Sequence, residues 1–186
     1  MPIRIMDTKK ATHEEWLQAR TKGIGGSDAG TLVGMNPYSG PLTLYSRKVG
    51  LVNDVEDNEA MRLGRDLEQY VADRFTERTG KRTRNDNYMY ADDEYPFLIA
   101  NIDRRIVGEN AALECKTMGS FNGYNLDADE VPASYYCQCQ HYMMVMGYDV
   151  MYLAILVLQK GLYVIPIERN DAFIAQLRDE IGRAHV

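Results

Sequence analysis

Two acids and a lysine fall close together in two neighbouring apolar stretches of the chain. Asp103 lies in residues 98–107, and Glu114 and Lys116 lie in residues 111–117. Because side chains alternate between the two faces of a strand, Glu114 and Lys116 share a face. If the turn between the stretches is two residues long, paired residue numbers sum to 217 and Asp103 stands opposite Glu114. A turn one residue longer would slip this register.

Facing carboxylates on strands otherwise rich in Ile, Val and Leu repel each other and destabilise the pair. A divalent cation would remove that cost, and oxygen ligands from Asp and Glu suit Mg²⁺ or Mn²⁺ better than zinc. Lys116 could then polarise an attacking water or stabilise the charge that develops on a phosphate, while the metal activates the water. The simpler alternative is a solvated hairpin in which Lys116 only neutralises Glu114. The order of helical acid, strand acid and acid-x-lysine favours the metal site.

Glu68 is the helical acid of this set. Residues 61–79 form a predicted helix that Gly80 ends, and its apolar residues recur at three- and four-residue spacing: Leu63, Leu67, Tyr70, Val71 and Phe75. Glu68 borders this apolar face, whereas Asp66 lies about 200° away and points outward. An acid at the edge of the core needs a partner, and a metal shared with Asp103 and Glu114 would supply one.

The elements that position these residues follow from periodicity and end signals. Thr12 and Glu15 form a capping box that opens a helix ending near Arg20. Ser27 or Asp28 is predicted to cap the next helix, after a glycine-rich turn. Further predicted helices cover residues 41–49 and about 134–147, with a last one from Asn170 or Asp171. Predicted strands cover residues 88–90, 98–107, 111–117, 150–158 and 161–167. This order predicts an α/β fold with a central mixed sheet flanked by helices.

The 186 residues, 45% of them apolar, predict a single domain over residues 1–186. We expect an N-terminal helical part at about 12–80, a sheet-rich core at about 86–167 and a C-terminal helix at about 171–184. The N-terminus shows no signal peptide, and no apolar run reaches about 18 residues, so we expect a soluble cytoplasmic protein without a membrane span. Three cysteines without CxxC spacing predict buried free thiols in a reducing compartment.

The net charge of −6 is the feature least typical of a DNA-binding protein. A nuclease nevertheless collects acids to hold metal, and its bases need only line one channel. One local basic cluster consists of Arg74, Arg78, Lys81, Arg82 and Arg84. A solvated helix face explains such a cluster as well as a phosphate track does.

Asp103 followed by Glu114-Cys115-Lys116 resembles the signature of the PD-(D/E)XK nuclease superfamily, with Glu68 in the place of its helical acid. Together with residues 20–34, 64–68 and 138–142, these motifs resemble the YqaJ viral recombinase family, the branch that includes the lambda-type alkaline exonucleases. The resemblance covers roughly residues 16–158 and implies a PD-(D/E)XK nuclease-like domain. One departure is Ile102, which stands where the superfamily often has proline.

The resemblance implies a Mg²⁺-dependent hydrolase, with Mn²⁺ as a substitute. Such an exonuclease digests one strand of double-stranded DNA from its 5′ end and leaves a 3′ overhang. It further implies a role in DNA recombination in which a single-strand annealing protein takes over the overhang. Relatives of this type close into trimeric rings around DNA, so a homotrimer is expected. A phage or prophage origin in a bacterial host is also expected.

The resemblance also implies roles for individual residues. Asp103, Glu114 and the carbonyl of Cys115 would bind the metal. Glu68 would bind a second metal or orient the attacking water, and Lys116 would be the catalytic lysine.

Two further pairs match motifs of the family. Gln138 and Tyr142, four residues apart on one helical face, would support the site and the DNA near it. Arg20 and Ser27 would hold the terminal 5′-phosphate. Each pair also has an ordinary structural explanation, a buried polar pair for the first and a helix end with its cap for the second. His141, between Gln138 and Tyr142, is interpreted as structural.

Two other functions remain open from the residues. An endonuclease of the same superfamily, like a restriction enzyme, would also cut a closed circle. A DNA-end binding or partner-docking module that kept the fold without chemistry would bind ends and release no nucleotides. The acid–acid–lysine set argues against this module, because a silent protein has no need for costly facing carboxylates.

Overall fold

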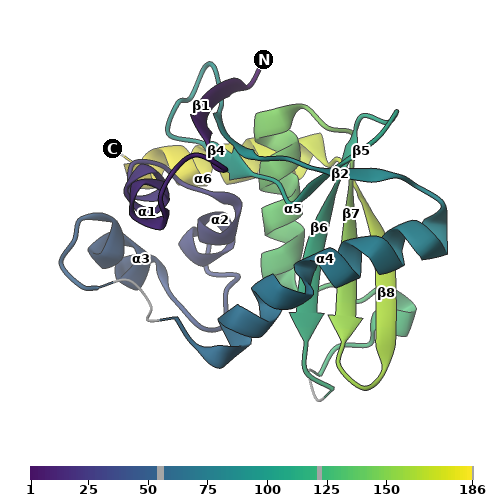
Figure 1. Cartoon of the computed structure of the whole chain (residues 1–186). Coiled ribbons are helices and arrows are strands. Elements are labelled where there is room, and N and C mark those ends of the chain that lie inside the picture. The colour runs from purple at the N-terminus through teal and green to yellow at the C-terminus, as the bar shows by residue number, and fades with distance from the viewer. Residues whose placement is uncertain (54–56, 121–122, 186) are drawn as a thin grey trace.

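The computed structural model describes residues 1–53, 57–120 and 123–185. It has the predicted α/β architecture, a central mixed sheet with helices on both faces (Figure 1). The helices are α1 His13–Thr21, α2 Gly26–Leu32, α3 Pro41–Lys48, α4 Glu59–Thr79, α5 Ala133–Met146 and α6 Asp171–His185, with a 3₁₀ turn η1 at Leu126–Ala128. The strands are β1 Ile3–Asp7, β2 Thr83–Asn85, β3 Tyr88–Ala91, β4 Ile99–Asn101, β5 Arg104–Ile106, β6 Ala111–Met118, β7 Val150–Val157 and β8 Gly161–Glu168.

The strands form two sheets. The central one has the order β2-β5-β6-β7-β8, and only β6 and β7 run parallel in it. The helix α5 makes the crossover between these two strands, as a parallel connection requires. A smaller antiparallel sheet has the order β1-β3-β4. Neither β1 nor β2 was predicted from the sequence, and both are short.

The predicted strand 98–107 is not one strand, and this expectation was wrong. Its first part, β4, pairs with β3 in the small sheet, and its second part, β5, pairs with β6 in the central sheet. Ile102 and Asp103 make the passage between the two sheets. The predicted register is confirmed, because Arg104 pairs with Leu113 and Arg105 with Ala112.

The start of α1 and the end of α4 lie where the sequence signals predict them, whereas the start of α2 does not. The capping box of α1 is present, with Thr12 Oγ1 accepting from the Glu15 amide at 3.2 Å. Gly80 ends α4 at a φ of +71°, in the left-handed region that glycine tolerates. The helix α2 begins earlier than predicted, with Gly25 as its N-cap. Asp28 lies at the third helical position instead, where its side chain accepts from the Gly25 amide at 3.1 Å.

Helices cover the two faces of the central sheet differently. On one face α4 packs through Val71, Ala72 and Phe75, whereas its predicted core residues Leu63 and Tyr70 are exposed. On the other face α5 is buried along most of its length, between the sheet, α2 and α6. The central sheet therefore receives side chains from α4 on one side and from α5 on the other.

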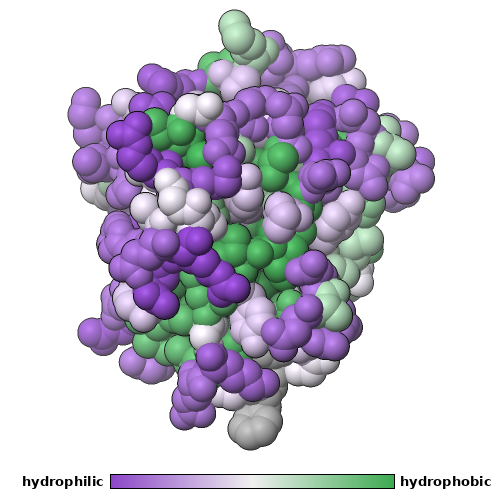
Figure 2. Space-filling model, turned by 90° about the vertical axis from the view of Figure 1, so that its right-hand side faces the viewer, coloured by the Kyte–Doolittle hydropathy of each residue, from purple (hydrophilic) through white to green (hydrophobic). Residues whose placement is uncertain are grey.

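Polar residues cover most of the side of the molecule seen in Figure 2, with a hydrophobic area between them. Among the described helices, none is both long enough and apolar enough to cross a bilayer. The longest of them, α4, carries charged residues along its whole length.

Candidate active site

Asp103 lies beside Glu114 where the chain passes from β4 of the small sheet to β5 of the central sheet. Its Oδ2 accepts a hydrogen bond from the Cys115 amide at 2.8 Å, which fixes the carboxylate against β6. Burial, reinforced by the charges of Glu114 and Glu68, raises the pKa of Asp103 well above its ordinary value. The predicted juxtaposition of two acids across the hairpin is therefore present, and it carries an electrostatic cost.

Glu114 is buried, with 3% of its surface exposed. Its Oε1 accepts from Gln138 Nε2 and pairs with Lys116 Nζ, both at 2.6 Å. Its Oε2 is also buried, and no described residue donates to it. Burial raises the pKa of Glu114, although the Lys116 ammonium opposes that change. A buried carboxylate oxygen without a hydrogen-bond donor lowers the stability of the folded state unless a ligand binds to it.

Lys116 projects from the same face of β6 as Glu114, as the strand alternation predicts. Its Nζ lies 5.3 Å from the centre of the Tyr135 ring on α5. Burial alone would lower the pKa of Lys116, but the carboxylates of Glu114 and Asp103 outweigh it and raise the pKa. Lys116 is therefore an ammonium group, suited to donate hydrogen bonds and stabilise negative charge rather than to accept a proton.

Glu68 does not join the other two acids in one group. It approaches from the α4 face of the sheet and pairs through Oε1 with Arg104 Nη1 at 2.5 Å. Glu114 instead contacts Gln138 of α5, on the other face of the sheet. Among the described residues no three His, Cys, Asp or Glu side chains form a group able to hold a metal ion. Glu68 is thus paired with an arginine in this structure, and its expected role as a metal ligand stays a prediction.

The remaining oxygen donors still fit a hard divalent cation. Asp103 and Glu114 are adjacent, and Glu114 Oε2 is a buried acceptor without a donor among the described residues. Carboxylate oxygens of this kind are the ligands that Mg²⁺ and Mn²⁺ prefer. A cation between the two acids would also remove their mutual repulsion.

Gln138 and Tyr142 connect this acid pair to α2. Gln138 Nε2 donates both to Glu114 Oε1 and to Tyr142 Oη, the latter at 3.1 Å. The Tyr142 ring packs against Gly26, where an added Cβ would lie 2.6 Å from a ring carbon. Gln138 is therefore in direct contact with Glu114, and Tyr142 contacts Gln138. Only a glycine allows α2 to approach Tyr142 so closely.

Arg20 and Ser27 are brought together as the resemblance implied. Arg20 Nη2 donates to Ser27 Oγ at 2.9 Å, and its guanidinium lies over the Trp16 ring at 4.7 Å. Arg20 also acts electrostatically on the Tyr142 phenol. Lys48 fixes the surrounding backbone, because its Nζ donates to the carbonyls of Arg20 and Gly23 and to Asp28.

Most of the basic cluster on and after α4 has local partners. Arg74 pairs with Glu77 and Lys81 with Glu109, both at 2.5 Å. Arg78 donates to the Leu162 carbonyl. These contacts fit a solvated helix face better than a phosphate track.

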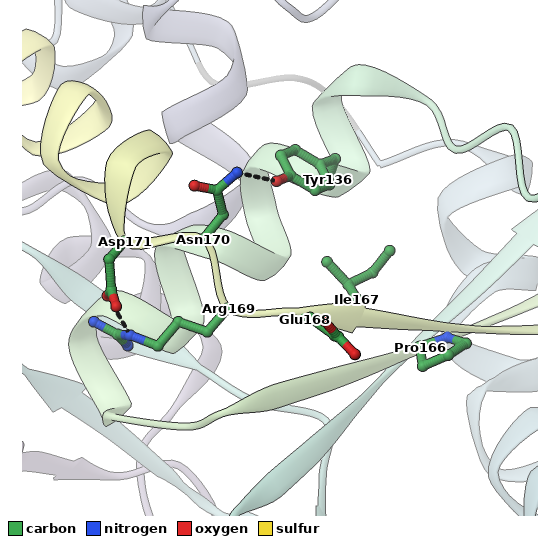
Figure 3. Close-up of a pocket in the computed structure, with 7 residues that line it drawn as sticks. All are labelled: Tyr136, Pro166, Ile167, Glu168, Arg169, Asn170 and Asp171. Atoms are coloured by element: carbon green, nitrogen blue, oxygen red, sulfur yellow. Dashed lines mark hydrogen bonds and ion pairs between the residues drawn. The ribbon is translucent and has the colours of Figure 1, made fainter.

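A pocket of about 460 Å³ lies where β8 meets α6 (Figure 3). Polar groups around it bond to each other, with Asn170 Nδ2 donating to Tyr136 Oη and Arg169 pairing with Asp171. Asn170 also caps α6 by accepting from the Phe173 amide. None of the predicted site residues lines this pocket. We therefore interpret this pocket as a structural feature of the capped start of α6 and not as a functional site.

The model of the YqaJ-like viral recombinase domain matches residues 15–149, a span that includes every predicted site residue. The chain belongs to this family. It is 42% identical over 173 residues to the uncharacterized protein YqaJ of Bacillus subtilis (strain 168), covering 91% of this chain and 54% of that one. The chain therefore spans about half the length of this curated relative.

Solved structures show the same fold. An alkaline exonuclease, LHK-Exo from Laribacter hongkongensis, superimposes with a TM-score of 0.76 at 20% identity, covering 92% of this chain and 90% of that one. A phage related exonuclease from Haemophilus somnus 129PT gives a TM-score of 0.70 at 12% identity, with 88% and 92% covered. The predicted family and fold class are thus confirmed for this YqaJ-like chain.

Sequence reasoning missed two basic residues of the site. Arg104 alternates with Ile102 and Ile106, and all three are buried. That alternation was a readable signal, because an arginine on an apolar face needs an acid nearby. Lys48 had no such signal, since a lysine at the end of a helix is ordinarily solvated.

His141 of α5 is buried, and its Nε2 lies 2.9 Å from the Ile99 carbonyl of β4. Burial lowers the pKa of His141, with partial opposition from that hydrogen bond. As the pH falls below about 6.5, His141 therefore takes up a proton more readily in the unfolded chain than in the folded one. The folded state loses stability as a result. Between pH 7.5 and 5.5 this loss amounts to at most about 1.4 kcal/mol.

We expect His141→Gln, which keeps a side-chain donor, to lose less stability over this pH range than the wild type. Urea unfolding at pH 7.5 and 5.5 measures the difference. His13→Gln, at an exposed position of α1, is the control and should follow the wild type. If the stability of His141→Gln depended on pH as that of the wild type does, His141 would not be the source of the stability loss.

Proposed function

We propose that this chain is a metal-dependent exonuclease that digests one strand of linear double-stranded DNA from 5′ to 3′ and leaves 3′ overhangs. The observation that carries the proposal is the acid pair Asp103–Glu114, with a buried Glu114 oxygen that has no donor among the described residues and with the Lys116 ammonium beside it. The fold shared with proteins named as exonucleases supports it.

Asp103, Glu114 and the Cys115 carbonyl would hold Mg²⁺, with Mn²⁺ as a substitute, and Glu68 would bind a second metal or orient water. The bound cation would favour ionisation of a water molecule and neutralise the negative charge of the phosphate. The side chains contribute the rest. Gln138 holds Glu114 Oε1 in place, so that Oε2 keeps its direction, and Tyr142 holds Gln138.

The reaction is the hydrolysis of a phosphodiester bond. The water oxygen forms a bond to phosphorus while the bond from phosphorus to the 3′-oxygen breaks, and that oxygen takes a proton. Lys116 lies where it could stabilise the extra negative charge on the phosphate oxygens. The products are a released mononucleotide and a strand that is one residue shorter and carries a new 5′-phosphate.

Arg20 and Ser27 would bind that new 5′-phosphate. Their contact at 2.9 Å presents a guanidinium and a hydroxyl side by side, and both can donate to phosphate oxygens. In support, Gly26, the neighbour of Ser27 on α2, packs against Tyr142 and Gln138, and Gln138 donates to Glu114. Binding of each new end there would keep the strand in register for the next cut.

We expect Arg20→Ala to narrow the preference for a 5′-phosphorylated duplex over a 5′-hydroxyl duplex. Loss of one charge-assisted contact costs roughly 1.5–3 kcal/mol, about tenfold to a hundredfold in rate if the contact acts in the transition state. Initial rates on the two substrates measure the ratio. Arg74→Ala, which removes an exposed arginine from α4, should leave the ratio unchanged. Equal rates on both substrates with the wild type would contradict the phosphate pocket.

DNA ends are the proposed partner, together with a single-strand annealing protein that would receive the 3′ overhang. A homotrimer that encircles the DNA is the proposed assembly. Sedimentation of the purified protein would test this, because a trimer has three times the 21.2 kDa mass of the chain.

The test of the proposed function is nucleotide release from a linear 5′-phosphorylated duplex, with Mg²⁺ and with EDTA, beside a closed circular duplex. Mg²⁺-dependent release from the linear DNA alone is the expected result. Cutting of the circle would instead identify an endonuclease. Binding of DNA ends without release from either substrate would identify the silent docking module.

A further inference from the structure

Arg104 is a deeply buried cation at the candidate site. It immediately follows Asp103 and is 5% exposed, on the face of β5 that points to α4. Leu113 lies opposite it and packs with Val71 and Phe75 of α4. A guanidinium at such a position remains charged, so it must find acceptors.

Its acceptors tie the helical acid to the strand acid. Arg104 Nη1 donates to Glu68 Oε1 at 2.5 Å and to the Asp103 carbonyl at 2.8 Å. Arg104 Nη2 donates to Gln69 Oε1 at 3.2 Å. One buried side chain therefore fixes the position of α4 relative to Asp103, the residue just before β5.

The two members of the Arg104–Glu68 pair differ in their freedom to change partners. The side chain of Arg104 is 6% exposed and that of Glu68 is 35% exposed. Glu68 can therefore exchange its partner for an ion from solvent, whereas Arg104 cannot move into water. Glu68 is also close enough to act electrostatically on both Asp103 and Glu114.

We propose that Arg104 is a positioning residue that competes with a divalent cation for the carboxylate of Glu68. The inference rests on the proposed function, because the cation is the one that the nuclease would use. The guanidinium holds Glu68 at the edge of the site and cancels its charge. Arg104 thereby weakens cation binding by Glu68. It raises the cation concentration that is needed before Glu68 binds the cation together with Asp103 and Glu114.

The competition has a definite sign. A neighbouring positive charge disfavours a cation, and one full charge at contact distance changes a binding equilibrium by about tenfold or more. Removing the charge of Arg104 should therefore tighten cation binding, provided that Glu68 is present. A purely structural role for Arg104 would predict weaker binding, or none, as the site loosens.

The experiment is calorimetric titration of the full chain with Mn²⁺, without DNA and after treatment with EDTA. We expect Arg104→Gln to bind Mn²⁺ about tenfold more tightly than the wild type. The matched control is Arg105→Gln, which removes the adjacent arginine but breaks a pair with Asp86 instead, and should not change the affinity. In a Glu68→Gln background, Arg104→Gln should have no effect.

Thermal unfolding would reveal whether Arg104→Gln folds. If it does not fold, a second and milder variant replaces it. Gln69→Ala removes the bond to Arg104 Nη2 and a bond from Gln69 Nε2 to Asp73, both at an exposed position of α4. It should shift Mn²⁺ affinity in the same direction by a smaller factor. Unchanged or weaker Mn²⁺ binding in folded Arg104→Gln or Gln69→Ala would overturn the inference.

The outcomes separate this inference from the proposed function. If the wild type binds Mn²⁺ and digests linear DNA while the Arg104 variant has wild-type affinity, only the inference fails. If the wild type neither binds Mn²⁺ nor releases nucleotides, the proposed function fails and the inference fails with it.

Discussion

Asp103→Asn is expected to abolish nucleotide release and, in the same protein, to raise thermal stability in EDTA. Asparagine retains an oxygen that can accept from the Cys115 amide, so the local geometry survives. It removes one negative ligand from the proposed cation, and several kcal/mol of transition-state stabilisation depend on that ion. We therefore expect the rate of release to fall by a factor of about 10³ or more.

The gain in stability follows from the pKa of Asp103. Burial and the neighbouring acids raise this pKa above its value in the unfolded chain. The stability associated with the protonated acid is therefore fully present below pH 3.8 and is lost as the pH rises through the raised folded-state value. Asparagine does not ionise, so it escapes this loss. The difference between variant and wild type should be largest at pH 8 and vanish near pH 4.

Thermal unfolding in EDTA at both pH values measures this effect, and each 1 kcal/mol corresponds to about 2–4 °C for a chain of this size. Mn²⁺ should raise the melting temperature of the wild type and not that of the variant. Asp66→Asn is the control, because it also removes one negative charge, but at an exposed position. A variant that melts earlier at pH 8, or that still digests DNA, would contradict the assignment of Asp103.

Lys116→Met is expected to lower the rate of nucleotide release by about 10²–10³, without weakening Mn²⁺ binding. Methionine keeps much of the length of the side chain and its packing near Tyr135, but it removes the ammonium. The charge developing on the phosphate would then lack its donor. Because Lys116 also neutralises Glu114, its loss should leave the acids more available to a cation.

Single-turnover digestion of linear duplex and Mn²⁺ titration together test this expectation. Lys160→Met is the matched control, since Lys160 is an exposed lysine in the turn between β7 and β8. The control should keep the wild-type rate. Loss of activity with an equal loss of Mn²⁺ affinity would instead assign Lys116 to support of the metal ligands.

Much of the fold and part of the candidate site could be predicted from local patterns. The alternation in β6 placed Glu114 and Lys116 on one face, and the short turn fixed the register that brings Asp103 beside them. The capping box of α1 and the glycine after α4 were also readable. These features depend on hydrogen bonds and side-chain directions within a few residues, or on one tight turn, so local sequence determines them.

The sequence did not determine which groups meet across elements. The stretch 98–107 divides between two sheets because Ile24 and β3 pair with its first half, and those contacts come from distant parts of the chain. Glu68 pairs with Arg104 because α4 crosses the face of the sheet on which that arginine emerges.

The resulting division has one physical cause. Sequence by itself determined the chemical types, their spacing along each strand and helix, and through these the family and the acid–acid–lysine set. Only the tertiary structure decided that Gln138 holds one oxygen of Glu114, that the other is left without a described donor, and that Arg104 holds Glu68. Such pairings depend on which faces of distant elements pack together, and packing is a property of the whole chain.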